Sequence, residues 1–91
     1  MILLAGYHAF SQTTARLEKQ KDAWGTGYTY VGPVKNGKAE GLGMANYAGT
    51  GVMYYVGYFA NGQFSGKGTL MFRTGEFVSG EWKNGSIQMV C

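Results

Sequence analysis

The glycine-rich segment Gly62–Gly68, GQFSGKG, is the stretch of this 91-residue sequence that comes nearest to a nucleotide-binding motif. A phosphate-binding loop has the spacing G-x-x-x-x-G-K-[ST] and is followed by a helix. Here the loop is one residue short, and Gly68 stands where serine or threonine is needed. The residues that follow alternate as in a strand. The segment therefore indicates strand glycines and not a phosphate site.

The other residue types that carry out catalysis or bind metals are few and far apart. His8 is the only histidine and Cys91 the only cysteine, so neither has the partner that a metal site or an activated nucleophile requires. The five carboxylates are scattered and suggest no acid–base pair. We expect no enzyme activity, no metal, no cofactor and no small-molecule substrate.

The composition describes one small domain rich in glycine and aromatic residues. There are 16 glycines, seven tyrosines, five phenylalanines and two tryptophans, and the net charge of +3 is spread along the chain. A single cysteine gives no internal disulfide. The apolar opening at residues 1–5 is too short for a signal-peptide core or a membrane span. We expect a soluble, cytoplasmic protein.

A repeat organises most of the chain. Asn-Gly pairs recur at residues 36–37, 61–62 and 84–85, and Asn-Gly is the strongest short signal for a tight hairpin turn. Before each pair stands Tyr-Val-Gly or Val-Ser-Gly, with the glycines 25 and then 23 residues apart. The pattern predicts a mainly β fold over residues 28–91. In this fold about six or seven short antiparallel strands form a meander of stacked hairpins in a single-layer sheet.

Strand alternation predicts which face of the sheet is the core. Tyr30 and Gly32 fall on one face, as do Tyr55 and Gly57 in the next unit. Glycines share this face with aromatic residues, so we expect each ring to cover a glycine of a neighbouring strand. Pro33 cannot donate a ladder hydrogen bond and therefore predicts an edge or a bulge.

Residues 1–27 differ in composition and are expected to cap the array. The segment 11–23, SQTTARLEKQKDA, contains no glycine or proline and is rich in helix-forming residues. Phe10, Leu17 and Trp24 recur every seven residues, which predicts one N-terminal helix over about 11–23. The apolar stripe is narrow, so this helix would need the sheet or a second chain to bury it.

The pattern Y-x-G-x-x-x-x-G, then G-x-G, then an aromatic residue four positions on, resembles the MORN repeat (membrane occupation and recognition nexus). The resemblance covers residues 28–86, about two and a half units, and is best in the middle unit. Pro33 and Val34 depart from the family pattern in the first unit, and Val78 departs from it in the third. The resemblance implies stacked hairpins that serve as scaffolds, dimerisation surfaces or modules appended to enzymes. It also implies binding of acidic phospholipid.

The face opposite the predicted core is partly apolar in the middle unit. Such a face on a single-layer sheet must be covered or used. Either the N-terminal helix covers it, or a partner protein binds there; we expect a non-enzymatic interaction module that acts as an adaptor, scaffold or inhibitor. The residues predicted to contact the partner are Tyr54, Val56, Tyr58, Met44, Met71, Lys67 and Arg73.

Three other partners remain as alternatives. The sheet edge near residues 86–90 predicts pairing with another copy, and hence a homodimer. Acidic phospholipid is a second alternative, although the basic residues are dispersed. Single-stranded nucleic acid is a third, with Tyr54 and Tyr58 stacking on bases and Lys35, Lys67 and Arg73 near phosphates.

Overall fold

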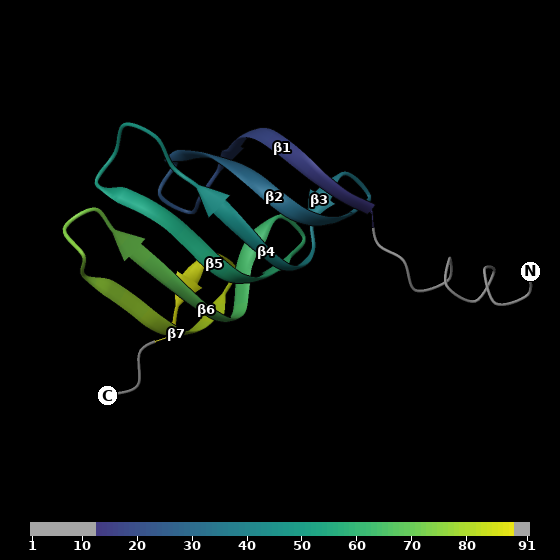
Figure 1. The fold of residues 1–91 in the computed structure, drawn as a ribbon. Helices are drawn as coiled ribbons and strands as arrows, with labels where there is room; N and C mark the ends of the chain where they lie inside the picture. The colour runs from purple at the N-terminus through teal and green to yellow at the C-terminus, as the bar shows by residue number, and fades with distance from the viewer. Residues whose placement is uncertain (1–12, 89–91) are drawn as a thin grey trace, which may run out of the picture.

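The structure, a computed structural model, describes residues 13–88 and contains eight β-strands and no helix within that range. The strands are β1 (Thr13–Lys21), β2 (Gly27–Lys35), β3 (Lys38–Ala39), β4 (Gly41–Asn46), β5 (Val52–Ala60), β6 (Gln63–Phe72), β7 (Phe77–Lys83) and β8 (Ser86–Ile87). They form one antiparallel sheet in the order β1-β2-β4-β5-β6-β7-β8, with β3 paired to β2 (Figure 1). The prediction of an antiparallel sheet of hairpin strands is confirmed.

The predicted N-terminal helix over residues 11–23 is wrong. Thr13–Lys21 forms a strand that pairs antiparallel with β2 at one edge of the sheet. Ala15 and Leu17 are partly buried, whereas Arg16 between them is exposed, as in a strand with one covered face. Leu17 packs against the core. The exposed edge of β2 offers this segment backbone hydrogen bonds and apolar contact, which outweigh a helix propensity that is marginal in isolation.

Of the other two residues of the predicted helical stripe, the described one, Trp24, does not join Leu17 in the core. Trp24 lies in the turn between β1 and β2, and its side chain is 60% exposed. Phe10 lies outside the described residues. β1 itself is irregular, because Lys19 has a φ of 59° and the pairing with β2 shifts between Leu17 and Gln20. A bulge of this kind twists an edge strand and discourages further pairing.

The three Asn-Gly pairs form the hairpin turns β2–β3, β5–β6 and β7–β8. The asparagines Asn36, Asn61 and Asn84 have φ values of 54°, 56° and 52°, and the glycines that follow them have φ values of 78°, 84° and 86°. Positive φ at both central residues is what a type I′ turn requires, and it matches the twist of the flanking strands. The predicted positions of all three turns are confirmed.

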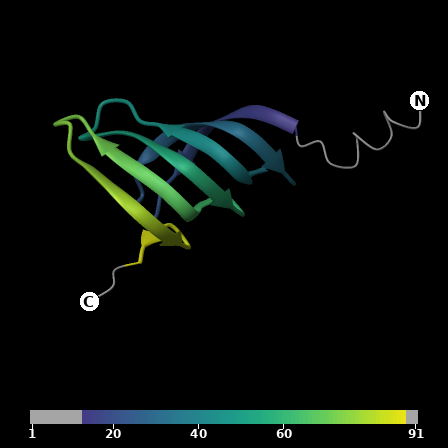
Figure 2. The same cartoon turned by 60° about the horizontal axis from the view of Figure 1, so that its bottom comes forward.

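The hairpin tips are hydrogen-bonded to one another, and we call this series of contacts the tip ladder. The Gly62 N–H donates to the Ala39 carbonyl at 2.9 Å, and the Gly85 N–H donates to the Phe64 carbonyl at 3.0 Å. The turn between β1 and β2 meets the last tip, where a Cβ on Gly85 would lie 3.1 Å from that of Ala23. Figure 2 shows the twisted sheet from below, with β8 at the end of β7. The chain's own turns thus help to cover the inner face.

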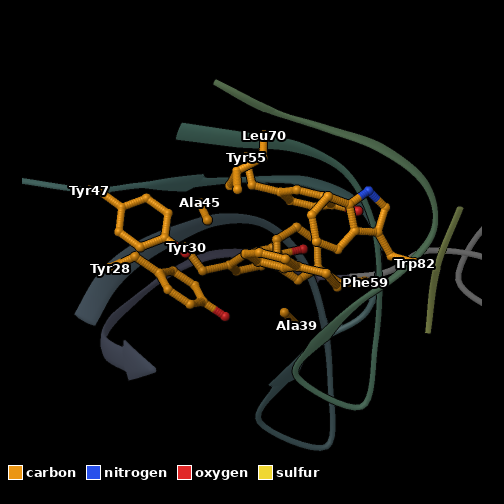
Figure 3. Packing of buried hydrophobic residues seen from close by; sticks show 10 residues of the cluster. Tyr28, Tyr30, Ala39, Ala45, Tyr47, Tyr55, Phe59, Leu70 and Trp82 are labelled. Carbon is orange, nitrogen blue, oxygen red and sulfur yellow. The ribbon is translucent and has the colours of Figure 1, made fainter. Parts of the chain in front are cut away.

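Aromatic side chains fill the inner face of the sheet (Figure 3). Tyr30 and Tyr55 are fully buried, and Tyr55 stacks on Phe64 with ring centroids 3.8 Å apart and ring planes 4° apart. Phe59 and Trp82 meet the Tyr55 ring edge-on. The buried residues of this core are Tyr28, Tyr30, Ala39, Ala45, Tyr47, Tyr55, Phe59, Phe64, Leu70 and Trp82.

The predicted packing of rings over glycines holds in the first two units. A Cβ added to Gly43 would lie 2.5 Å from a ring carbon of Tyr30, and one added to Gly68 would overlap the ring of Tyr55. The two hydroxyls donate to equivalent carbonyls three residues on, Tyr30 to Pro33 at 2.6 Å and Tyr55 to Tyr58 at 2.9 Å.

The third unit has a different cover for its glycine. Val78 stands where the earlier units have tyrosine, and Gly80 lies under Ile87 of β8, whose Cδ1 would be 3.3 Å from an added Cβ. An aliphatic side chain therefore replaces the ring at the end of the array.

Pro33 lies at a bulge and not at an edge. Val31 is opposite Met44 but Val34 is opposite Ala39, so residues 32–33 face the longer segment 40–43. On its other side Pro33 is opposite Thr14 of β1. The bulge alternative was the correct one, because β1 takes the edge position.

Candidate functional site

Apolar side chains gather on the face of the sheet opposite the core, and we call this set the outer-face band. Its members are Val31, Leu42, Met44, Tyr54, Val56, Tyr58, Met71 and Phe77. They come from the five strands β2, β4, β5, β6 and β7. Five of them keep between 42% and 62% of their surface exposed: Val31, Leu42, Val56, Tyr58 and Phe77.

Strand register makes the outer-face band contiguous. Met44 of β4 stands opposite both Val31 of β2 and Val56 of β5. The equivalent place further along is held by Met71 of β6, which stands opposite Tyr54 and Phe77. Residues directly opposite on one face have Cβ atoms about 4.5–5.5 Å apart, close enough for side chains to touch. The band is therefore one apolar surface across the width of the sheet.

Polar residues border the outer-face band at both of its ends. Lys67 of β6 is opposite Glu81 of β7, and both are exposed. At the other end Asn46 is opposite Thr29 and Tyr54. Between the strands of the last unit, the hydroxyls of Thr69 and Ser79 share a hydrogen bond of 2.9 Å. An apolar centre with a polar border is the usual anatomy of a protein interaction surface.

Two segments of the chain match a known repeat family. Residues 55–77 and 79–89 match the family model of the MORN repeat. These are two MORN units. MORN repeats are generally involved in protein–protein or membrane and lipid interactions. Neither curated proteins nor solved structures gave a match to the chain.

The first hairpin unit lies outside both MORN matches but shares their geometry. Tyr30 covers Gly43 as Tyr55 covers Gly68, and the turn at Asn36 has the same backbone conformation as the one at Asn61. The sequence of this unit differs from the family pattern at Pro33 and Val34.

Six of the seven predicted contact residues lie together on the outer face. Tyr54, Val56, Tyr58, Met44 and Met71 belong to the band, and Lys67 lies at its border. Sequence reasoning left Leu42 out of the predicted contact set; the register puts it opposite Tyr58. It also left Val31 and Phe77 out of the contact set, although the alternation of residues places both on this face.

Arg73 lies elsewhere. It follows β6, and its guanidinium donates to the backbone carbonyls of Thr50 at 2.7 Å and Tyr47 at 3.1 Å. Its own N–H donates to the Gly51 carbonyl at 2.9 Å. Arg73 therefore ties the connections of two neighbouring hairpin units together at one end of the sheet, away from the outer-face band.

A hollow lies beside Trp24 on the inner side. It has a volume of about 280 Å³ and is lined by Asp22, Trp24, Thr26, Val52, Leu70 and Phe72. Its one carboxylate is occupied within the fold. Asp22 Oδ1 accepts from the N–H groups of Trp24 and Thr26 at 2.9 and 2.8 Å, and Oδ2 accepts from the Tyr47 hydroxyl at 2.8 Å. The arrangement orders the β1–β2 turn.

Burial sets the protonation of the inner tyrosines. It raises the pKa of Tyr28 to about 12, with the negative charge of Asp22 as a second cause. The pKa of Tyr47 is raised further by burial together with its hydrogen bond to Asp22. Burial also raises the pKa of Tyr55. These hydroxyls therefore stay neutral above the pH at which an exposed tyrosine ionises.

The described residues offer no metal centre. Across residues 13–88 no three histidine, cysteine, aspartate or glutamate side chains come together in a way that could hold an ion. Within the same residues no helix could cross a membrane. His8 and Cys91 lie outside the described range.

Proposed function

We propose that this protein is a non-enzymatic interaction module that binds a partner protein through the outer-face band, as an adaptor, scaffold or inhibitor. The observation that carries the proposal is the contiguous apolar surface from Val31 to Phe77. Contiguous exposed apolar patches of this kind mark sites of association. The inner face already buries its aromatic residues, so the outer face is the surface that the fold leaves for binding.

The charges around the outer-face band favour a protein over a membrane surface. Juxtaposed basic residues are needed to hold acidic headgroups. Here Lys67 stands opposite Glu81, and Arg16 is paired with Glu18 at 3.2 Å. These two basic residues are therefore each matched by a carboxylate, as suits a partner whose own contact surface is mostly apolar.

The nucleic-acid alternative has less support from the structure. It places Tyr54 and Tyr58 on bases, with Lys35, Lys67 and Arg73 near phosphates. The Arg73 guanidinium is used for backbone carbonyls at the end of the sheet. Binding of single-stranded nucleic acid requires basic side chains along the same surface as the rings that stack on its bases.

The first experiment identifies the partner at the band. A photo-crosslinking amino acid at Tyr58 should capture a protein in cells, and the same amino acid at Lys38, an exposed hairpin-tip residue, serves as the control. The captured protein is then purified, and its affinity for the intact chain is measured. Capture at Lys38 but not at Tyr58 would place the contact surface elsewhere.

The second experiment tests the residues of the band. Replacing Tyr54 and Tyr58 with serine should weaken the purified complex at least about tenfold, since aromatic side chains at the centre of an interface carry much of its binding energy. A Lys38→Ser, Lys83→Ser variant is the matched control and should bind normally. If the double tyrosine variant unfolds, the affinity is measured instead with the single change Tyr58→Ser, which alters the more exposed ring. Unchanged affinity would refute the proposal.

Two cheaper assays address the alternatives. The chain is tested for co-sedimentation with vesicles that contain acidic lipid. Co-sedimentation that is lost in the Tyr58→Ser variant would indicate that the outer-face band binds a membrane and not a protein. Retention on single-stranded DNA that falls steeply with salt would replace it with nucleic acid. We expect neither.

A further inference from the structure

Each of the three Asn-Gly turns is open to a spontaneous reaction within its own backbone. The glycine nitrogen can attack the side-chain carbonyl carbon of the asparagine before it, because glycine has no side chain to block the approach. A new N–C bond forms, the C–N bond of the side-chain amide breaks, and ammonia leaves with the proton of the glycine nitrogen. Water then opens the succinimide ring to aspartate or isoaspartate. The net reaction exchanges ammonia for water.

The three turns share one sequence and one backbone conformation. The φ values of Asn36, Asn61 and Asn84 lie between 52° and 56°, as in the type I′ hairpin. Closing the ring requires the glycine nitrogen to give up its hydrogen bond, to lose its proton to water and to turn toward the side chain. A turn that opens rarely therefore reacts slowly. The surroundings of each turn, and not its sequence, set its rate.

The glycine nitrogens differ in how well the fold shields them. In the tip ladder the N–H groups of Gly62 and Gly85 donate to carbonyls of the preceding hairpin at 2.9 and 3.0 Å. Gly62 is half-buried and Gly85 is buried. Gly37 is exposed, and no described residue lies within 4 Å of a Cβ at that position. The tip ladder therefore shields the second and third turns more than the first.

Charge differs between the first two turns in the same direction. The attacking nitrogen is deprotonated, so nearby positive charge favours the reaction and nearby negative charge opposes it. Two exposed lysines, Lys35 and Lys38, flank the first turn and stand opposite each other in the β2–β3 pair. At the second turn the Glu40 carboxylate accepts from the Asn61 N–H at 3.0 Å. The third turn has one flanking lysine, but its glycine is buried.

We propose that Asn36 is a site of spontaneous deamidation in the folded protein, and that the tip ladder protects Asn61 and Asn84, with the Glu40 carboxylate adding to the protection of Asn61. The substrate is the turn itself, and water is the only co-reactant. The expected order of rates is Asn36, then Asn61, then Asn84, because the three glycines are exposed, half-buried and buried in that order.

The two products should affect the hairpin differently. Aspartate tolerates positive φ as asparagine does, so the aspartyl form keeps the turn. Isoaspartate carries the backbone through the former side chain and adds a methylene to it, which does not fit a tight two-residue turn. Ala39, which follows this turn, provides the carbonyl that accepts from Gly62. Isoaspartate at position 36 should therefore loosen the second turn through the tip ladder.

Peptide mapping by mass spectrometry tests the order of rates, on the full chain incubated in mildly alkaline buffer. Asn36 should deamidate about two- to tenfold faster than Asn61, the factor that one backbone hydrogen bond is worth, and Asn84 should be the slowest. In concentrated urea the three sites should react at similar rates. Equal rates in the folded protein, or faster reaction at Asn61 or Asn84, would overturn the proposal. An order that persists in urea would belong to the sequence and would overturn it as well.

Hydrogen exchange measures the shielding of the three glycine amides directly. By NMR the Gly37 amide should exchange fastest, and the Gly62 and Gly85 amides should be protected, since they exchange only when the tip opens. A Gly37 amide as protected as the other two would contradict the proposal.

Two variants test the surroundings of the second turn. Glu40→Gln keeps an oxygen that can accept from the Asn61 N–H but removes the charge, so Asn61 should react about twofold faster while Asn36 is unchanged. No increase at Asn61 would refute the role of the carboxylate. Asn36→Asp reproduces the aspartyl product, and its Asn61 should react at the wild-type rate. In aged wild type, Asn61 should accelerate as isoaspartate accumulates at position 36; a constant rate would refute the coupling through the tip ladder.

Discussion

The ring of Tyr55 lies across Gly68 of the neighbouring strand, where a Cβ would overlap it. Its hydroxyl reaches beyond the glycine to the carbonyl of Tyr58 at 2.9 Å. One side chain therefore fills the space above a residue without a side chain and satisfies a backbone acceptor at the bulge. Tyr30 makes the same pair of contacts with Gly43 and Pro33.

Replacing Gly68 with valine should destabilise the fold by about 2–4 kcal/mol, because the Tyr55 ring must leave its place in the core. Gly51→Val is the matched control: nothing lies within 4 Å of a Cβ there. Urea unfolding followed by tryptophan fluorescence measures both. A Gly68→Val variant as stable as the parent would refute the packing of rings over glycines.

The hydrogen bond from Tyr47 to Asp22 ties the β1–β2 turn to the far end of β4. Tyr47→Phe should lower the free energy of unfolding by about 1.5–3 kcal/mol, the usual range for a hydrogen bond to a charged group. Asp22→Ala should cost more, because Oδ1 also accepts two backbone N–H groups. The double variant tests the link, since the two effects should be less than additive. Fully additive effects would contradict it, and the exposed Glu18→Ala variant serves as control.

Stability should fall in alkaline solution because of the inner tyrosines. Burial raises the pKa of Tyr28 to about 12 from 10.0, and it also raises the pKa values of Tyr30, Tyr47 and Tyr55. The stabilisation is complete below pH 10 and is lost as pH rises through the folded pKa, since the unfolded chain releases its protons first. A tyrosine that is ionised in the unfolded chain and neutral in the fold should lower the free energy of unfolding by about 1.4 kcal/mol per pH unit in that window.

Urea unfolding at a series of pH values from about 9 to 11.5, together with tyrosinate absorbance, checks this slope. Tyr47→Phe should make the slope shallower. Stability that stays constant over the series would contradict the burial of these hydroxyls.

Glycine substitutions distinguish the observed β1 from the helix that composition suggests. Lys19 has a φ of 59°, a conformation that costs an L-residue about 1–2 kcal/mol, so Lys19→Gly should be neutral or stabilising. Lys21→Gly, in ordinary strand conformation, should destabilise by about 0.5–1 kcal/mol. In a helix both changes would destabilise alike. Thermal unfolding measures the stability of the two variants. Equal losses of stability would support a helix and contradict the observed β1.

Local rules were enough to predict the hairpins. A type I′ turn needs two residues that tolerate positive φ, and that demand falls on neighbouring positions such as Asn61 and Gly62, so it can be read from the sequence. Alternation then assigned Tyr55 to the core and Tyr58 to the outer face. Most of the outer-face band follows from these two rules.

What was missed depends on contacts between distant residues. The segment before Trp24 has helix-forming composition, and only the neighbouring edge of β2 makes it a strand. Nothing in the sequence around Arg73 indicates that its guanidinium binds within the fold. It does so because two connections lie close together at the end of the sheet. Phe64 was also missed in the core, although its place, three residues after the asparagine of the turn, is the one that Ala39 and Ile87 hold in the other units.

The tip ladder links each hairpin only to the one before it. Gly62 reaches back to Ala39 and Gly85 reaches back to Phe64. Because these bonds involve backbone atoms alone, they place no demand on side-chain identity. Duplication of one unit would reproduce both the bond that it gives and the bond that it receives. Whole hairpins can therefore be added along the tip ladder in evolution or by design, with folding energy growing in nearly equal steps, once the contact between Gly85 and Ala23 of the β1–β2 turn is rebuilt.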